Sequence, residues 1–269
     1  MNYLTSILAG LTEGLSAALP LSETGHRRLF FELSCEEIPA LLPLAVALAM
    51  ALVFRKTLFL MLGSILDLFK KVKAGKFRWK KANRYQKMAL LAPVAAVPYW
   101  LIALLQARYA ILDGLGSTLL LVGILLALNA GLLFIGDFSE EKDWDHIDMT
   151  VGHAIKLGLF QAASFLPGFS RLGMTLCMAR NMGFSKTCAL EFSMMTGILA
   201  VLGGELINLG GSIASVSDWG LWAVAFGAAL AAAVGGLLLL KALVKRDKTY
   251  LLMIYSIAAG IGAVVLNFI

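Results

Sequence analysis

The sequence predicts an all-α integral membrane protein with six transmembrane helices and two re-entrant helical hairpins arranged as an inverted repeat. Three observations carry this prediction. Of the 269 residues, 59% are hydrophobic and only 15% are charged, whereas a soluble domain has about 25% charged residues. Several segments approach the roughly 20 apolar residues that cross a bilayer. Two other segments are interrupted near their middle by a proline and polar residues.

The six expected spans are long apolar segments at 38–55, 88–106, 117–137, 188–208, 220–241 and 249–268. The two interrupted segments, 4–34 and 151–185, each contain two short helix-like runs, and neither run crosses a bilayer comfortably. Such broken hairpins are tolerated at membrane depth when they are buried in protein or line a wet cavity. They are therefore the natural place for a polar site.

The order of these segments predicts a single membrane domain, 1–269, built from one unit at about 1–137 and a second at about 150–269. An odd number of spans in each unit gives the two units opposite orientations, as in many transporters whose sites lie near the midplane. Residues 148 positions apart support the pairing. They place Glu13 on Gln161, Ser22 on Ser170 and Gly25 on Gly173.

Lysine and arginine bias predicts the orientation. The loop "KKVKAGKFRWKKANRYQK" (70–87) and the "KRDK" run (245–248) are both expected on the cytoplasmic side. The same count places both termini outside, with the first hairpin entering the membrane from the outer face and the second from the cytoplasmic face. The net charge of +6 is concentrated in the basic loop, so it indicates topology rather than nucleic-acid binding.

The first polar break is "ALPLSETGH" (18–26). Pro20 ends the preceding helix, and Ser22 or Thr24 is placed to cap the next one. The free N–H groups and positive dipole end of that half-helix attract an anion. His26 is a candidate acid, base or nucleophile, because its side chain titrates nearest neutrality.

The second break is "LPGFSRLGMT" (166–175). Gly168 lets backbone N–H groups approach a ligand closely, and Arg171 offers a fork of donors suited to phosphate. An arginine inside a membrane segment marks a functional site by default, although a structural pair with Glu13 or Glu23 is the alternative. Together the two breaks predict a pocket for an anionic head group on a long apolar tail.

At these residues the chain resembles the undecaprenyl pyrophosphate phosphatase family, also called the bacitracin-resistance family. The resemblance rests on "EGLSAALPLSETGH" (13–26) and "PGFSRLGMT" (167–175) and extends over essentially the whole chain. It implies hydrolysis of undecaprenyl diphosphate to undecaprenyl phosphate, which is reused as the lipid carrier of peptidoglycan synthesis. It also implies a site facing the outer side of the inner membrane, a divalent cation (Mg²⁺ or Ca²⁺) and a long-chain isoprenyl diphosphate as substrate.

Carried over by position, the resemblance makes Glu13, His26 and Arg171 the catalytic candidates. It assigns substrate binding to Ser22, Thr24, Gly25, Ser170 and Thr175, to which the glycine argument adds Gly168. The chain departs from the family pattern at three positions, because Ala17 replaces a glutamate, Glu23 replaces a serine and Leu172 replaces another serine.

The departures suggest a compensation hypothesis. Glu23 would reach into the space beside Ala17, where it would hold the cation together with Glu13 or orient His26. Either His26 or a metal-bound water would then attack the phosphorus. Two alternatives to the phosphatase remain, a lipid-phosphate transporter or flippase, for which inverted repeats are suited, and a lipid-binding homologue without hydrolysis.

Overall fold

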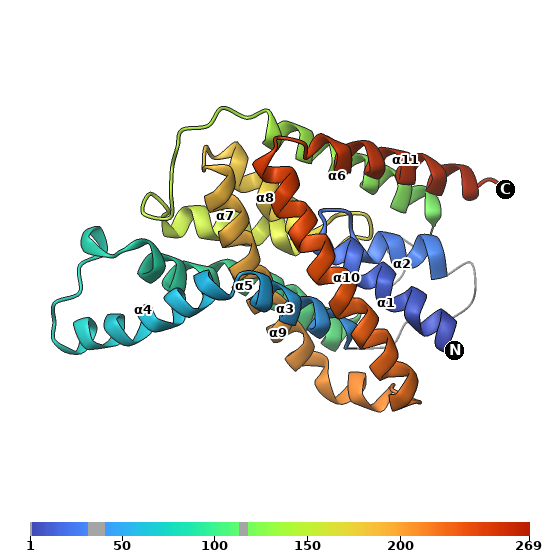
Figure 1. Ribbon diagram of the computed structural model, residues 1–269, viewed down its shortest axis with the longest axis horizontal. Helices are drawn as coiled ribbons and strands as arrows, with labels where there is room; N and C mark the ends of the chain where they lie inside the picture. The colour runs from blue at the N-terminus through green and yellow to red at the C-terminus, as the bar shows by residue number, and fades with distance from the viewer. Residues whose placement is uncertain (1, 32–40, 113–117) are drawn as a thin grey trace.

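The computed structural model describes residues 2–31, 41–112 and 118–269, and that part of the chain is helical apart from turns and one isolated β-bridge (Figure 1). The predicted ranges 32–34 and 38–40, and residue 117, lie outside the described residues. The helices are α1 (Tyr3–Ala18), α2 (Glu23–Phe31), α3 (Leu42–Val53), α4 (Arg55–Lys73), η2 (Trp79–Lys81), α5 (Arg84–Tyr109), α6 (Leu119–Asp137), α7 (Val151–Ala162), η3 (Ala163–Phe165), α8 (Arg171–Asn181), α9 (Lys186–Ala214), α10 (Trp219–Lys245) and α11 (Tyr250–Leu266).

Within the described residues, four helices are long and apolar enough to cross a membrane, namely α5, α6, α9 and α10. The chain therefore has multiple apolar helices, as expected, but fewer clear spans than the six predicted. The first predicted span, 38–55, corresponds to α3, which has 12 residues and ends at Val53, where the chain bends by 84° into α4. If that bent pair counts as one span the total is five, and the apolar helix α11 has only 17 residues.

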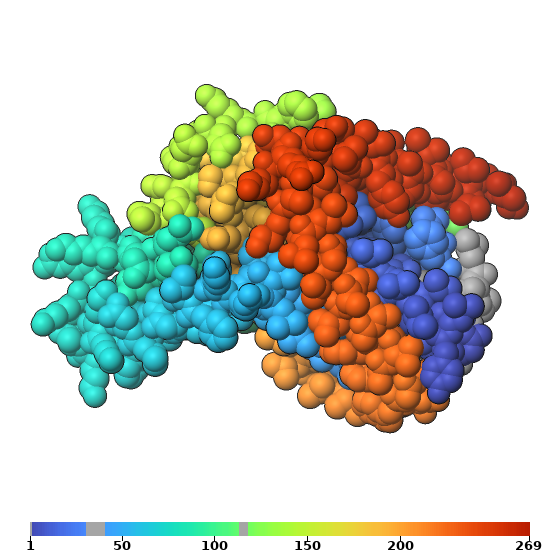
Figure 2. All heavy atoms as spheres, in the orientation of Figure 1, coloured from blue at the N-terminus to red at the C-terminus, as the bar shows by residue number. Residues whose placement is uncertain are grey.

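The segment after the bend differs most from expectation. Helix α4 continues to Lys73, so the beginning of the predicted basic loop is helical, and its last turn carries three lysines. Figure 2 shows α4 and the turn that follows it projecting from the body of the molecule. Basic last-turn residues are favoured at the negative end of the helix dipole, and with Arg55 and Lys56 at its start α4 carries charges at both ends.

The two interrupted segments form helix pairs, α1 with α2 and α7 with α8. Helix α1 ends at Ala18, directly before Leu19 and Pro20. In the second pair, α7 tightens into the 3₁₀ turn η3, and α8 begins after Ser170. Proline and the polar cap residues therefore break both helices where the sequence pattern predicts.

Glycines bring the first helix of each pair against a long helix of the other half of the chain. Helix α1 packs on α10, where a Cβ at Gly10 would lie 2.2 Å from the Ala225 carbonyl oxygen. Helix α7 packs on α5, where a Cβ at Gly158 would lie 2.3 Å from the Ala95 carbonyl oxygen. Gly10 and Gly158 are 148 positions apart. Only glycine allows backbones to approach this closely, as at membrane helix interfaces.

Helices α6 and α11 lie side by side (Figure 1). They meet at Gly123 and Gly260, where a Cβ on either residue would lie within 2.8 Å of the other's carbonyl oxygen. The two broken pairs come together beneath these helices, since α2 and α8 both contact α6. This arrangement brings the two polar breaks to one place.

Candidate functional site

The two polar breaks are joined by the hydroxyl of Ser22. Its Oγ accepts hydrogen bonds from the backbone N–H of Gly25 and from that of Gly168, both at 3.1 Å. The first bond caps α2, and the second crosses to the other hairpin. Ser22 is fully buried and has φ +73°, a left-handed conformation that is uncommon for a residue with a Cβ. The strain indicates that surrounding contacts hold Ser22 in place.

Ser170 plays the corresponding part for α8. Its Oγ accepts from the backbone N–H of Gly173 at 3.1 Å, so Ser170 caps α8 as Ser22, one of the two predicted cap candidates, caps α2. The side chain of Asn129 on α6 links the two breaks a second time. Its amide donates to the Pro20 carbonyl at 3.1 Å, and its oxygen accepts from the Ser170 N–H at 3.0 Å. The two helix N-termini are therefore fixed relative to each other.

The predicted glycines make this close meeting possible. Gly168 has φ +130°, and a Cβ there would lie 2.4 Å from the Leu125 Cβ. A Cβ on Gly25 would lie 3.3 Å from the Gly168 Cα. Any side chain at Gly168 would meet both backbone strain and a collision, so glycine is required for packing whether or not a ligand binds.

Four charged side chains from both hairpins lie beside this junction. Arg171 donates from Nη2 to Glu23 Oε2 at 3.0 Å, and from Nη1 to the Tyr99 hydroxyl at 3.3 Å. Arg27 donates from Nε to Glu13 Oε2 at 2.7 Å. Glu13 is fully buried, and the Arg171 side chain is 7% exposed. The structure thus shows Arg171 paired with Glu23, which is the pairing alternative raised by the sequence.

The two ring nitrogens of His26 contact groups other than Arg171. Its Nδ1 lies 2.8 Å from the Ser22 carbonyl oxygen, and its Nε2 lies 3.0 Å from the Tyr255 hydroxyl. A carbonyl only accepts hydrogen bonds, so Nδ1 carries the proton and Nε2 accepts from Tyr255. Among the described residues no hydrogen bond joins His26 to Arg171. The imidazole also lines an adjacent groove.

That groove lies between α1, α2 and α11 and has a volume of about 390 Å³. It is mostly apolar, and polar groups enter it from Thr12, Ser16, His26 and Tyr255. The Tyr255 ring stacks on the imidazole at a centroid distance of 5.6 Å. A cavity of this size with a few polar groups is typical of a small-molecule site.

Two predicted substrate-binding residues are placed differently from the others. The Thr175 hydroxyl is buried and donates within its own helix, to the carbonyls of Arg171 and Leu172. Thr24 lies at the edge of the junction, with its hydroxyl 3.4 Å from Ser22 Oγ. The hydroxyl of Thr175 thus supports α8, and Thr24 extends the Ser22 cap.

Comparison with known proteins places this site in a family. The family model described as Bacitracin resistance protein BacA matches residues 6–262. The chain belongs to the BacA family. It is 30% identical over 276 residues to an undecaprenyl-diphosphatase of Clavibacter michiganensis subsp. michiganensis, covering 99% of this chain and 97% of the relative. It is 28% identical to an undecaprenyl-diphosphatase of Desulforapulum autotrophicum, with 100% of both chains covered.

In this BacA-family chain, the divalent cation that the resemblance implies meets two carboxylates that already hold arginines. Glu13 Oε1 has no hydrogen-bond partner among the described residues, but Oε2 of the same group is bound to Arg27. Mg²⁺ and Ca²⁺ need about six to eight oxygen ligands, and Ala17 offers none. An added cation would also lie beside two positive charges. The residues do not fit a divalent cation while Arg27 stays in place, so no catalytic step is assigned to a metal.

The structure adds site residues that the sequence analysis did not single out. They are Arg27, Tyr99, Asn129, Glu205 and Tyr255. Glu205 on α9 is within electrostatic range of both arginines, so three acids face two arginines. Arg27 carried a usable signal, because it is a charged residue in an apolar segment directly after His26. The sequence gives no signal for Tyr99, Asn129 or Tyr255, since tertiary packing alone brings α5, α6 and α11 to the hairpins.

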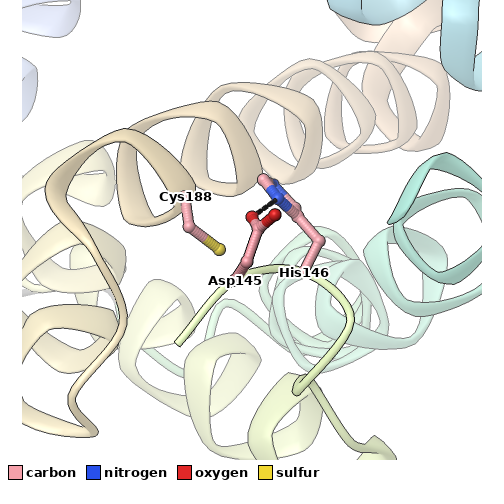
Figure 3. A group of neighbouring side chains, drawn as sticks. All are labelled: Asp145, His146 and Cys188. Atoms are coloured by element: carbon pink, nitrogen blue, oxygen red, sulfur yellow. Dashed lines mark hydrogen bonds and ion pairs between the residues drawn. The ribbon is translucent and has the colours of Figure 1, made fainter. Parts of the chain in front are cut away.

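A second polar cluster lies between the acidic loop "SEEKDWDHIDM" (139–149) and α9 (Figure 3). The ligand atoms of Asp145, His146 and Cys188 all lie within 4.8 Å of one another, and such a donor set is typical of zinc. The guanidinium of Arg84, however, already lies 3.4 Å from His146 Nδ1 and 3.1 Å from Glu191. Arg84 therefore supplies the positive charge, and the cluster fastens the acidic loop to α5 and α9.

Burial sets the protonation of this second cluster. His146 is 1% exposed, and burial lowers its pKa even though Asp145 opposes the shift. Burial alone would raise the pKa of Asp145, but hydrogen bonds from the backbone and side chain of His146 outweigh it and hold that pKa below its usual value. Near neutral pH the cluster thus contains a neutral imidazole and an ionised carboxylate.

Proposed function

We propose that this chain hydrolyses undecaprenyl diphosphate to undecaprenyl phosphate and inorganic phosphate, and so recycles the lipid carrier of peptidoglycan synthesis. Family membership supports the proposal, as do relatives named undecaprenyl-diphosphatase that align over nearly the whole chain. The observation that carries it is the junction of two half-helix N-termini at Ser22, beside Arg171.

The junction has the properties of a diphosphate site. Helix N-termini bind anions through free N–H groups and the helix dipole, and here two of them meet. Arg171 would bind the transferring phosphoryl group by exchanging its bond to Glu23 for one to phosphate oxygens. Fixed donors that already point at developing charge are a large source of rate enhancement. The Tyr99 hydroxyl, 3.3 Å from Nη1, would hold the guanidinium during this exchange.

The groove beside His26 suits the apolar part of the substrate. It is lined by the imidazole, by leucines of α1 and by residues of α11. An isoprenyl tail in this groove would bring its diphosphate to the junction between the hairpins. Burial of the tail stabilises binding by about 25 cal/mol per Å² of apolar surface, and the polar groups then set the position of the phosphates.

His26 would carry the proton or the nucleophile. The lone pair on Nε2 either takes the proton of an attacking water or attacks the terminal phosphorus itself. In both routes the bond between the terminal phosphorus and the bridging oxygen breaks, and the bridging oxygen leaves on undecaprenyl phosphate. In the covalent route, water then hydrolyses the phosphohistidine. Tyr255 must release Nε2 before either step.

The finer architecture belongs to the same proposal. Six spans with two re-entrant hairpins in an inverted repeat are supported by the reciprocal packing of α1 on α10 and α7 on α5. Both termini lie at one end of the long axis, and the basic segment after α4 lies at the other (Figure 1). This separation supports a basic loop in the cytoplasm, with the termini and the site facing the outer side of the inner membrane.

The test is phosphate release from a long-chain isoprenyl diphosphate by the protein purified in detergent. We expect His26→Ala and Arg171→Ala to abolish release. His153→Ala and Arg246→Ala are matched controls outside the junction and should retain it. Folded wild-type protein that binds the lipid but releases no phosphate at any pH or with any divalent ion would refute hydrolysis and favour a lipid-binding or transport role.

A further inference from the structure

Arg27 occupies an unusual position in the charged cluster. It lies on α2, four residues after Glu23 and so on the same face of the helix. Its Nε is bound to Glu13, which is fully buried. Its side chain is nevertheless 31% exposed. The Nε edge of the guanidinium is thus anchored on a buried carboxylate, while part of the side chain stays accessible.

The charges alternate through the cluster. Arg27 neutralises Glu13 and lies one helical turn from Glu23, which in turn binds Arg171. A buried carboxylate without a partner is strongly unfavourable, so Glu13 needs a positive charge beside it. Arg27 provides that charge as a side chain of the protein itself. A divalent cation, which the family resemblance implies at Glu13, would have to displace it.

The guanidinium is also a phosphate ligand. Its planar fork matches two phosphate oxygens, and it stays charged at every accessible pH. Among the described residues Glu13 is its recorded hydrogen-bond partner, and that bond uses only Nε. Arg27 pairs with Glu13 and Arg171 pairs with Glu23, so two guanidinium groups belong to the charged cluster beside the junction where the diphosphate is expected.

We propose that Arg27 is a diphosphate-binding residue that takes the place of a divalent cation, so that substrate binding and turnover need no metal ion. The inference rests on the proposed function for its substrate. It is based on the hydrogen bond between Arg27 and Glu13, the predicted metal ligand. Arg27 would bind the phosphate that remains on the lipid or the one that leaves, and would lower the negative charge that builds up on breaking the anhydride.

The first experiment measures turnover without metal. Protein is purified in detergent, treated with EDTA and shown to be metal-free by elemental analysis. We expect release of phosphate from a long-chain isoprenyl diphosphate to continue, and addition of Mg²⁺ or Ca²⁺ to change kcat/KM by less than about twofold. Loss of turnover in EDTA with recovery on adding either ion overturns the inference while leaving the phosphatase intact.

The second experiment measures binding and does not depend on hydrolysis. The probe is farnesyl methylene-bisphosphonate, a non-hydrolysable diphosphate analogue, titrated by calorimetry in metal-free buffer. We expect the wild type to bind, and Arg27→Gln to weaken binding about 10- to 100-fold, the range for a hydrogen bond to a charged group. Arg27→Lys keeps the charge but not the planar fork of donors, and its affinity for the probe should lie between those of the wild type and Arg27→Gln. The exposed Arg246→Gln is the matched control and should bind as the wild type does.

Arg27→Gln leaves Glu13 buried without its partner and can unfold. The double variant Glu13→Gln, Arg27→Gln removes both charges and should still show the same loss of affinity. Probe binding that requires Mg²⁺, or that is unchanged in a folded Arg27 variant, overturns the inference. Protein that binds the probe without metal but never hydrolyses the diphosphate supports Arg27 as a ligand and refutes the phosphatase.

Discussion

Replacing Ser22 tests the junction between the two hairpins, and Ser170 provides an internal control. Both serines cap a half-helix and are 148 positions apart. Ser22 Oγ accepts two backbone N–H groups, whereas Ser170 Oγ accepts one. Ser22→Ala therefore strands one more buried donor, that of Gly168, than Ser170→Ala does.

The magnitude follows from that count. A buried N–H without a partner costs about 1–3 kcal/mol, so Ser22→Ala should lower the free energy of unfolding by about 2–6 kcal/mol. Ser170→Ala loses one cap, worth about 1 kcal/mol. At about 2–4 °C per kcal/mol, we expect the melting temperature of Ser22→Ala to lie several degrees below that of Ser170→Ala.

A third variant separates the hydroxyl from the backbone. Ser22 has φ +73°, which glycine adopts without strain. Ser22→Gly should therefore melt above Ser22→Ala, by the equivalent of about 1–2 kcal/mol. The assay is thermal unfolding in detergent followed by circular dichroism and tryptophan fluorescence. Equal melting temperatures for Ser22→Ala and Ser170→Ala would show that the hydrogen bond between the hairpins does not exist in solution.

Three further predictions concern other positions. Gly168→Ala should lower the melting temperature strongly, because the new Cβ collides with Leu125 and the residue has a positive φ. Gly131→Ala on α6, where a Cβ meets open space, should leave the melting temperature unchanged or raise it. Equal melting temperatures for the two variants would contradict the close packing at Gly168. Tyr255→Phe keeps the ring stack but removes the donor to His26 Nε2. Because Nε2 must be released before catalysis, this variant should raise kcat/KM by about 5- to 10-fold with an unchanged melting temperature. Kinetics identical to those of the wild type would show that this hydrogen bond plays no part in the mechanism. Burial lowers the pKa of His146, so the stability that its neutral form contributes is complete above about pH 6.5 and is lost as the pH falls below that value. Lowering the pH from 7.5 to 5.5 should therefore lower the melting temperature of the wild type more than that of His146→Gln.

The sequence was sufficient where a feature depends on composition or on local backbone chemistry. A chain with 15% charged residues has too little polar surface for an ordinary soluble fold. Pro20 and the serine caps end and begin helices through contacts within four residues, so both breaks were predictable, as was a polar site at them. Glu23 and Arg171 were recognised as intramembrane charges because any such charge needs a partner.

Choosing the partners required the tertiary structure. Glu23 and Arg171 occupy equivalent positions 148 residues apart, and only the meeting of the two hairpins made them bind each other rather than a metal or His26. Likewise, Tyr255 reaches His26 because α11 packs on α6 beside α2. The bend between α3 and α4 lies at the predicted end of the first span, but hydropathy could not show the direction in which the chain continues. Local patterns thus determined which groups are polar and where the helices break, while long-range packing decided which charge neutralises which.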